Sequence, residues 1–261
     1  MSAALQDGGQ AASAGTPLVE SLARGMLILD QFNRRRELGG AELARLTGLA
    51  QPTVWRLCYT LKCLGVLQDA AHGRMRLGAG ALALGFEALS DLPLSEAGRP
   101  LMQEIAEELD TAVTLALREG TVVIYVQRCQ SERLQFSGLR VGTSAPILSS
   151  PAGWGLVAGL PSEEREALFV QLDSGGALSL DVRRDLECAI SAYEAVGYVE
   201  THGLLHPNLR AVSVPLARPG RAVSWCLSCG GHDVAFDGEA VARAGSRLRE
   251  LAELLSLFVP D

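Results

Sequence analysis

The chain reads Gly40-Ala-Glu-Leu-Ala-Arg-Leu-Thr-Gly-Leu-Ala-Gln-Pro-Thr-Val-Trp-Arg-Leu57 over the stretch that decides its fold. Apolar residues at helical spacing up to Leu46 predict a first helix. Gly48 is placed to end this helix in the left-handed conformation that glycine adopts easily. Pro52 suits the first turn of a second helix, where the missing N–H would have had no partner. The stretch therefore predicts two helices joined by a tight turn.

The second helix is predicted to have one apolar and one polar face. The residues expected to pack inward recur at steps of three and four and are Val54, Leu57, Cys58, Leu61 and Leu64. The opposite face carries the residues expected to contact DNA, which are Gln51, Thr53, Trp55, Arg56 and Tyr59. A helix-turn-helix places such a second helix in the major groove, where Arg56 is the preferred candidate for a bidentate contact with guanine. Because two packed helices with a glycine turn also occur in proteins that never touch DNA, the motif alone leaves both interpretations open.

A short hairpin is predicted directly after this helix, with strands over residues 66–69 and 74–77. Side chains two apart in a strand point the same way, so Arg74 and Arg76 share a face that can reach the phosphate backbone or the minor groove. An ordinary surface hairpin is the alternative. A helix over residues 21–32, with Leu22, Met26, Leu29 and Phe32 inward, precedes the motif. Residues 20–78 are thus predicted to form a winged helix-turn-helix.

Charge is divided unevenly along the chain, whose net charge is −7. Residues 20–80 carry nine Arg and Lys against five acidic residues, a net of +4. Residues 91–261 carry fourteen Arg against twenty-three acidic residues, a net of −9. Phosphate contacts supply most non-specific affinity for DNA, so a basic module on an acidic body is typical of a DNA-binding regulator.

The rest of the chain is predicted to be α+β. Residues 1–19 are expected to form a disordered tail, and residues 79–90 a linker helix that is apolar around much of its circumference, as in a helix buried against a partner. From residue 91 to 261, strands in antiparallel pairs alternate with helices, which we expect on one side of the sheet. The amino terminus does not resemble a signal peptide, and no apolar run approaches the length of a membrane span. We therefore expect a cytoplasmic protein without a membrane partner.

Several motifs together resemble the isocitrate-lyase-regulator (IclR) family of bacterial transcription factors. They are Ser21-Leu-x-Arg24, Glu42-Leu-Ala-Arg-Leu-Thr-Gly-Leu49, Pro52-Thr-Val-x-Arg-Leu57, Arg74-x-Arg-Leu-Gly78, Ser150-x-Ala-Gly-x-Gly-Leu-Val-Ala-Gly-Leu-Pro161, Gly197-Tyr198 and Pro207-x-Leu-Arg-x-Val-Ser-Val-Pro-Leu216. The resemblance implies a winged helix-turn-helix followed by a GAF-like α+β effector domain. It also implies a homodimer or homotetramer, formed through the DNA-binding domains and the linker helix, whose effector is a small organic or aromatic acid. No cofactor and no catalytic residue are expected.

The effector site is expected at the start of the helix that follows Ser150. Backbone amides at a helix amino terminus can hold a carboxylate, here those of Ala152 and Gly153. The other candidates for contact are Ser150, Trp154, Thr201, His202 and Ser228, with Leu115 and Trp225 as apolar walls. The chain departs from the family in this segment, since Trp154 stands where a lysine is usual and Pro151 offers no N–H. These changes hint at a bulkier, aromatic ligand.

Six cysteines raise an alternative from another class of protein. Cys226-Leu-Ser-Cys229 with His232 imitates the spacing of zinc ligands, but residues three apart on a strand point to opposite faces and no second pair completes four ligands. No metal is therefore expected. The alternative function is a thiol-based redox sensor or a Cys-dependent enzyme that uses the α+β domain, with Cys129, Cys188, Cys226 or Cys229 reactive.

Overall fold

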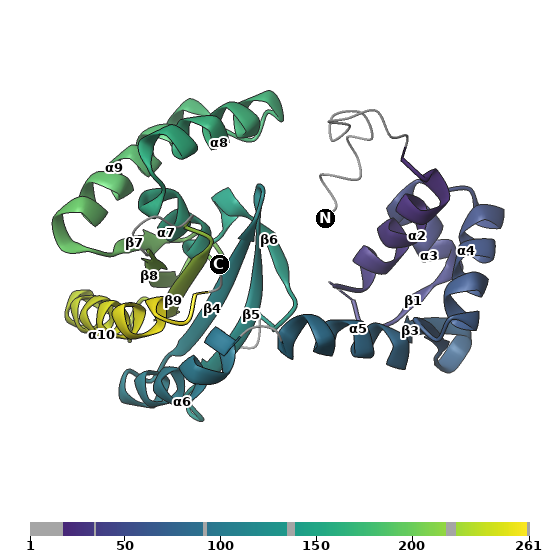
Figure 1. Cartoon of the computed structure of the whole chain (residues 1–261), viewed down its shortest axis with the longest axis horizontal. Helices are drawn as coiled ribbons and strands as arrows, with labels where there is room; N and C mark the ends of the chain where they lie inside the picture. Colours follow the sequence, from purple (N-terminus) through teal and green to yellow (C-terminus); the bar gives the residue numbers. More distant parts are fainter. Residues whose placement is uncertain (1–17, 34, 91–92, 135–138, 218–222, 260–261) are drawn as a thin grey trace. The chain divides into compact units, whose positions relative to one another are not determined.

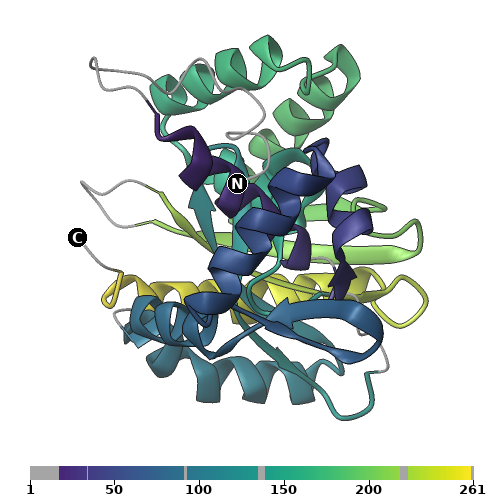
Figure 2. The ribbon, with the colours of Figure 1, turned by 90° about the vertical axis from the view of Figure 1, so that its right-hand side faces the viewer.

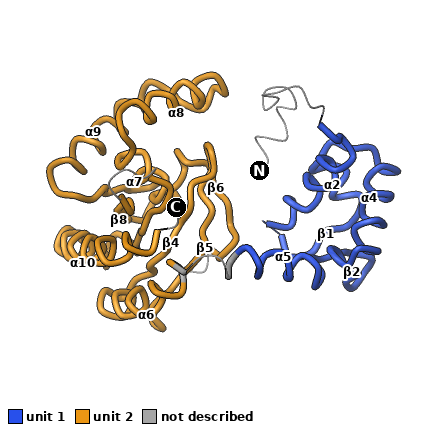
Figure 3. Tube along the Cα trace, viewed as in Figure 1, with its two compact units in different colours: residues 1–91 blue, residues 92–261 orange. Residues whose placement is uncertain are grey.

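The computed structural model describes residues 18–33, 35–90, 93–134, 139–217 and 223–259 of the 261-residue chain. The chain divides into two compact units, residues 1–91 and 92–261 (Figure 3). Most of the tail that the sequence predicts, residues 1–17, lies outside the described residues.

The first unit is a winged helix-turn-helix (Figure 1). Its elements are α2 (Glu20–Asp30), β1 (Leu38–Gly39), α3 (Gly40–Thr47), α4 (Gln51–Cys63), β2 (Leu67–Asp69), β3 (Arg74–Leu77) and α5 (Ala79–Ser90), with short 3-10 turns at Gln31–Asn33 and Ala71–Gly73. Gly48 ends α3 with a φ of 69°, as the sequence predicts. The hairpin is also confirmed, and β1, which the sequence analysis missed, pairs with β3 to make an antiparallel sheet in the order β1-β3-β2.

Two predictions about this unit's core are wrong. In α2 the buried side chains are Ile28 and, just beyond the helix, Phe32, whereas Leu22 and Met26 are exposed. In α4, Val54 and Cys58 are buried, but Leu64, directly after this helix, is 67% exposed. Apolar residues surround most of α2, so periodicity alone could not distinguish the face that packs against α4 from the face left open.

The second unit is built on one antiparallel sheet in the order β6-β5-β4-β9-β8-β7. Its strands are β4 (Ala112–Glu119), β5 (Val122–Gln130), β6 (Ser144–Pro146), β7 (Val199–His202), β8 (Leu209–Leu216) and β9 (Trp225–His232). Its helices are α6 (Pro93–Glu108), α7 (Pro151–Gly159), α8 (Ser162–Ser174), α9 (Leu180–Val196) and α10 (Gly238–Ser256), with a 3-10 turn at Ile147–Ser149. From the sequence we expect a weak strand over residues 134–139, of which residues 135–138 lie outside the described residues, and no strand at the position of β7.

Helices cover both faces of this sheet, which corrects the expectation that they lie on one side. Residues of α6 and α10 share a buried cluster with Val113, Leu115 and Leu227 of the sheet. Residues of α7, α8 and α9 share another with Ala116, Tyr125 and Cys226. Figures 1 and 2 show the two helical layers on opposite sides of the sheet. Side chains alternate along β4, so both of its faces are apolar and need a cover.

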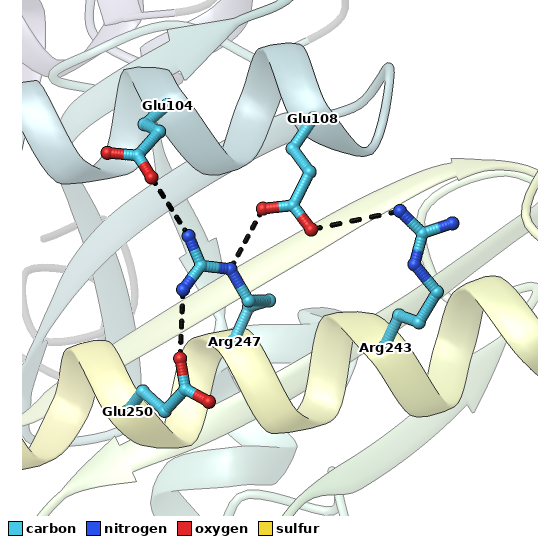
Figure 4. Close-up of polar contacts among 5 residues, drawn as sticks. All are labelled: Glu104, Glu108, Arg243, Arg247 and Glu250. Atoms are coloured by element: carbon cyan, nitrogen blue, oxygen red, sulfur yellow. Dashed lines mark hydrogen bonds and ion pairs between the residues drawn. The ribbon is translucent and has the colours of Figure 1, made fainter.

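Ion pairs join α6 to α10 at the surface (Figure 4). Arg247 of α10 reaches Glu108 at 2.8 Å and Glu104 at 3.1 Å, both on α6, and Glu250 of its own helix at 2.8 Å. Arg243 contacts Glu108 at 3.7 Å. At another point along the two helices, Gly98 of α6 lies against Leu255 of α10, where an added Cβ would be 2.9 Å from a side-chain methyl carbon. The two helices therefore form one layer.

The linker helix α5 leaves large apolar side chains uncovered. Leu82, Leu84 and Phe86 are each more than 60% exposed. Within the part of the first unit that the structure describes, these side chains of the helix that the sequence predicts to be buried against a partner are therefore uncovered. Among the described residues, no helix has the length and apolar character needed to cross a membrane.

Candidate functional site

The outer face of α4 carries an exposed aromatic pair. The rings of Trp55 and Tyr59 stack with their centroids 5.7 Å apart, and both residues are more than half exposed. Gln51, one turn before Trp55, is also exposed. Gln51, Trp55 and Tyr59 border a shallow hollow that reaches Met75 on the wing strand β3. Trp55 is therefore not buried against the wing, and the stacked pair faces solvent.

Arg56 lies on the other side of this face, beside α2. It is exposed and borders a groove between α2 and α4, together with Thr53 and Thr60. Thr53 is half-buried, so it is the least accessible of the α4 residues proposed from the sequence. The outer face of α4 thus presents the Arg56 side chain and a flat aromatic stack.

The two wing arginines differ in their surroundings, although they share a face of β3. Arg74 is half-buried and its Nη2 donates hydrogen bonds to the carbonyl of Glu37 at 2.6 Å and to the carboxylate of Glu42 at 3.2 Å. Arg35 also pairs with Glu42. Arg76 is exposed. Arg74 is therefore tied to Glu37 and Glu42 while its side chain stays partly exposed, whereas Arg76 faces solvent.

A pocket, here called the sheet-face pocket, opens on the face of the second unit's sheet that α7 covers. Its empty space is about 510 Å³, part of which is open to solvent. The strands supply Ala112, Thr114, Tyr125, Arg128, Thr201, Leu209, Ala211, Ser228, Cys229 and Gly230, and the connecting segments with α7 supply Leu139, Pro151, Leu204 and Leu205. The lining is therefore mainly apolar, with a few polar groups on the strands, as is usual for small-molecule sites.

A β-bulge brings two of these polar groups onto one face. Thr114 pairs with Arg128, but Ala116 pairs with Tyr125, so Val126 is an extra residue in β5. Side chains three apart on a regular strand point to opposite faces. The bulge at Val126 shifts this alternation, and Tyr125 and Arg128 both line the pocket.

Hydroxyl groups meet in two pairs around the pocket. Thr114 Oγ1 lies 2.7 Å from Ser228 Oγ on the neighbouring strand. Tyr125 Oη lies 2.7 Å from Ser150 Oγ. Burial raises the pKa of Tyr125 to about 12, although the hydrogen bond with Ser150 opposes the rise. Tyr125 is therefore a neutral hydrogen-bonding group at physiological pH.

The amino end of α7 is closed by the chain's own groups. Ser150 caps the helix, because its Oγ accepts a hydrogen bond from the Gly153 N–H at 3.2 Å. The Trp154 N–H donates to the Ser150 carbonyl at 3.1 Å, and Pro151 has no N–H. A Cβ at position 153 would lie 1.9 Å from the carbonyl oxygen of Ile147, so the preceding turn covers this side of the helix. Among residues 151–154, Ala152 alone has an N–H that takes part in none of these hydrogen bonds, and Ala152 is fully buried.

The structure separates the other predicted effector contacts. Thr201 and Ser228 line the pocket, whereas Ser150 lies behind Tyr125 as the helix cap. Trp154 is half-buried and its Nε1 donates to the Leu148 carbonyl at 2.9 Å, away from the pocket lining. His202 follows Thr201 on β7, so it points to the opposite face and lies 3.6 Å from Asp233.

Two expected apolar walls are corrected as well. Leu115 and Trp225 pack in the cluster under α6 and α10, on the face away from α7. The sequence analysis missed Thr114, Tyr125 and Arg128. Thr114 could have been found, because it is a polar residue inside an apolar strand.

The sequence matches two family descriptions, "IclR helix-turn-helix domain" over residues 21–70 and "Bacterial transcriptional regulator IclR C-terminal" over residues 86–257. The chain belongs to the IclR family of bacterial transcriptional regulators. As an IclR regulator it has a DNA-binding helix-turn-helix. This decides between the two interpretations that the motif alone leaves open.

Known proteins are similar to this IclR regulator in sequence or fold along most of its length. It is 30% identical to the HTH-type transcriptional regulator TsaQ1/TsaQ2 of Comamonas testosteroni, over 81% of this chain and 77% of that protein. A crystal structure of an IclR-family regulator from Brucella abortus is 32% identical, with a TM-score of 0.75 over 93% of this chain and 94% of that one. An IclR homolog from Microbacterium hydrocarbonoxydans, crystallised with 4-hydroxybenzoate, shares the fold at 21% identity, with a TM-score of 0.75 over 91% of this chain and 98% of that one.

The cysteines of this IclR regulator give little support to thiol chemistry. Burial raises the pKa values of Cys129, Cys226 and Cys229, which disfavours the reactive thiolate. Cys188 is exposed on α9. Cys226 and Cys229 lie in the clusters on opposite faces of the sheet, as their spacing on a strand predicts. No group of three or more metal-ligating side chains occurs among the described residues.

Proposed function

We propose that this IclR-family protein is a sequence-specific regulator whose affinity for operator DNA changes when a small organic acid binds in the sheet-face pocket. The observation that carries the DNA part is the exposed face of α4, where Arg56 flanks the stacked Trp55 and Tyr59. An arginine can read guanine bidentately, and an aromatic ring can pack against a thymine methyl or a sugar. The exposed Arg76 of the wing can neutralise a phosphate.

The pocket is the proposed effector site. It combines an apolar lining with polar groups from adjacent strands, and the 4-hydroxybenzoate bound to the Microbacterium hydrocarbonoxydans protein makes an aromatic acid a reasonable first probe. An effector acts only through different affinities for the DNA-competent and incompetent arrangements, a coupling of about 1–3 kcal/mol. The proposal therefore predicts that operator DNA changes effector affinity by the same factor.

The DNA part is tested by selecting bound fragments from genomic DNA with the purified protein, followed by titrations at several salt concentrations. We expect the logarithm of affinity to fall linearly with the logarithm of salt concentration. Arg56→Ala is expected to cost about 1–3 kcal/mol on the selected site while non-specific affinity stays similar. An unchanged footprint and affinity in Arg56→Ala would refute the role of Arg56, and the absence of salt-sensitive binding to any fragment would refute the function.

We also propose that the protein acts as a homodimer or homotetramer. Leu82 and Phe86, four residues apart on one face of α5 and both exposed, form an apolar surface that a second copy can cover. Phe86→Glu is expected to shift the protein toward monomer in sedimentation velocity runs and to weaken binding to a palindromic operator. Val170→Glu alters an equally exposed apolar residue on α8 and is the matched control. Identical oligomeric states for Phe86→Glu and the native protein would exclude α5 as the interface.

A further inference from the structure

The charge in the sheet-face pocket comes from one residue. Among the described residues that line the pocket, Arg128 is the only one with a charged side chain. It is half-buried on β5, directly opposite Thr114, which in turn pairs with Ser228 of β9. Arg128, Thr114 and Ser228 therefore form a row across three strands on the pocket face. All three residues line the pocket.

The environment of Arg128 favours an anion as its neighbour. Burial lowers the pKa of Arg128, because partial removal from water disfavours the charged form. Its Nε and Nη2 donate to Gln130 Oε1 at 3.3 and 2.8 Å, and this amide oxygen is neutral. A carboxylate oxygen accepts stronger, charge-assisted hydrogen bonds from the same fork of N–H groups.

The other possible anion site in the pocket region, the amino end of α7, is poorly placed to compete. Its Gly153 N–H is taken by Ser150 Oγ, and the carbonyl of Ile147 fills the space beside it. Pro151, which does line the pocket, presents a ring without an N–H. A ligand carboxylate at this end would displace the helix cap, whereas at Arg128 it meets a guanidinium that already lines the pocket.

We propose that Arg128 binds the carboxylate of the acid in the sheet-face pocket, an inference that rests on the proposed function of this pocket as the effector site. The Thr114–Ser228 hydroxyl pair lies beside the carboxylate in the same row. The rest of the molecule lies against the apolar lining, which includes Leu205 and Leu209. The site therefore takes an acid with one carboxylate and an apolar or aromatic body, and discriminates against the uncharged amide of the same shape.

Isothermal titration calorimetry with benzoate, 4-hydroxybenzoate and phenylacetate, and with the primary amide of each, tests this assignment. We expect the native protein to bind at least one acid about tenfold or more tightly than its amide. Arg128→Gln is expected to weaken the binding of that acid by about 30-fold or more, since one partner of a half-buried charged contact is lost. Its affinity for the amide should change less than threefold.

Two further variants separate recognition from folding. Arg133→Gln removes the same charge from an exposed position outside the pocket lining, and its affinities should match those of the native protein. Arg128→Lys keeps the charge but loses the planar fork, so its acid affinity is expected to fall between those of the native protein and Arg128→Gln. If Arg128→Gln does not fold, as judged by circular dichroism, the acid affinity of Arg128→Lys tests the assignment in its place.

The outcomes also distinguish this inference from the function on which it rests. An Arg128 variant that folds and keeps its full preference for acid over amide would overturn the assignment. Native protein that binds amides as tightly as acids would overturn it too, while leaving the pocket as an effector site. Native protein that binds neither the acids nor their amides would overturn both the role of Arg128 and the proposal that the pocket is the effector site.

Discussion

The side-chain amide of Gln103 in α6 donates a hydrogen bond of 3.1 Å to the backbone carbonyl of Gln130 at the end of β5. Two residues earlier in the same strand, Arg128 lines the pocket and bonds to the Gln130 side chain. Cys129 Sγ adds a weak contact to the Arg99 carbonyl of α6 at 3.6 Å. The strand that carries the pocket's cation is thus bonded to the helix that begins two residues after the DNA-binding unit ends.

Gln103→Ala is therefore expected to reduce the coupling between effector and DNA. The ratio of operator affinities with and without the tightest-binding acid of the panel should fall threefold or more, because a shift in β5 is then passed less directly to α6. Acid affinity in the absence of DNA should change less than twofold. Fluorescence anisotropy with labelled operator, in the presence and absence of the acid, measures the ratio of operator affinities.

Gln103 also donates to Glu107 Oε1 at 2.7 Å. Glu107→Ala removes this partner and leaves the contact with Gln130, so it is the matched control and should keep the native ratio. A Gln103→Ala protein with an undiminished ratio would show that α6 does not receive the signal at Gln130.

The wing arginines are expected to differ when each is replaced by alanine. Arg76→Ala removes an exposed cation and should lower the salt slope of DNA binding by about one phosphate contact. Arg74→Ala breaks the bonds to Glu37 and Glu42, so its main effect should be a loss of about 1 kcal/mol of unfolding free energy. Salt-dependent titrations and urea unfolding separate the two effects. A larger slope change in Arg74→Ala than in Arg76→Ala would contradict this division.

Sequence reasoning succeeded where local chemistry decides the structure. Gly48 ends α3 in the left-handed conformation, and Pro52 lies in the first turn of α4, as their own backbone properties predict. It was wrong at Leu64, which is 67% exposed instead of packed inward. It also failed at Leu22, because tertiary packing selects one of two apolar faces of α2.

The pocket shows a second limit of prediction from the sequence. Ser228 and Thr201, two of the candidates from the sequence, line the pocket, but Arg128 was not predicted to do so, because its face depends on the bulge at Val126. Nothing in the apolar run that precedes Arg128 signals an extra residue. Trp154 and His202 were chosen for their chemistry, yet the Leu148 carbonyl and the alternation of β7 direct them elsewhere.

Gly153→Ala is expected to destabilise the effector unit strongly. The added Cβ would lie 1.9 Å from the backbone carbonyl of Ile147, which cannot rotate away as a side chain would. Overpacking of this kind costs about 1–3 kcal/mol, and here we expect the upper end. Gly238→Ala, where nothing lies within 4 Å of the added Cβ, should stay within about 0.5 kcal/mol of the native protein. Equal unfolding midpoints for the two variants in urea would contradict the close approach.

Tyr125 is expected to make stability fall at alkaline pH. Burial raises its pKa in the folded protein to about 12, whereas an unfolded tyrosine has a pKa of about 10. The unfolded chain therefore loses this proton first, and the free energy of unfolding falls as pH rises from about 10 toward 12, by about 2 kcal/mol at most. In Tyr125→Phe this contribution is absent. At pH 8 the variant should be about 1 kcal/mol less stable than the native protein, because the bond to Ser150 is lost.

The difference between the two proteins should then shrink as pH rises above 10. The buried cysteines also contribute at alkaline pH, but they are present in both proteins and cancel in the difference. Urea unfolding followed by tryptophan fluorescence between pH 8 and 11 measures it. A difference that stays constant over this range would mean that the Tyr125 hydroxyl is not held in its neutral form by the protein.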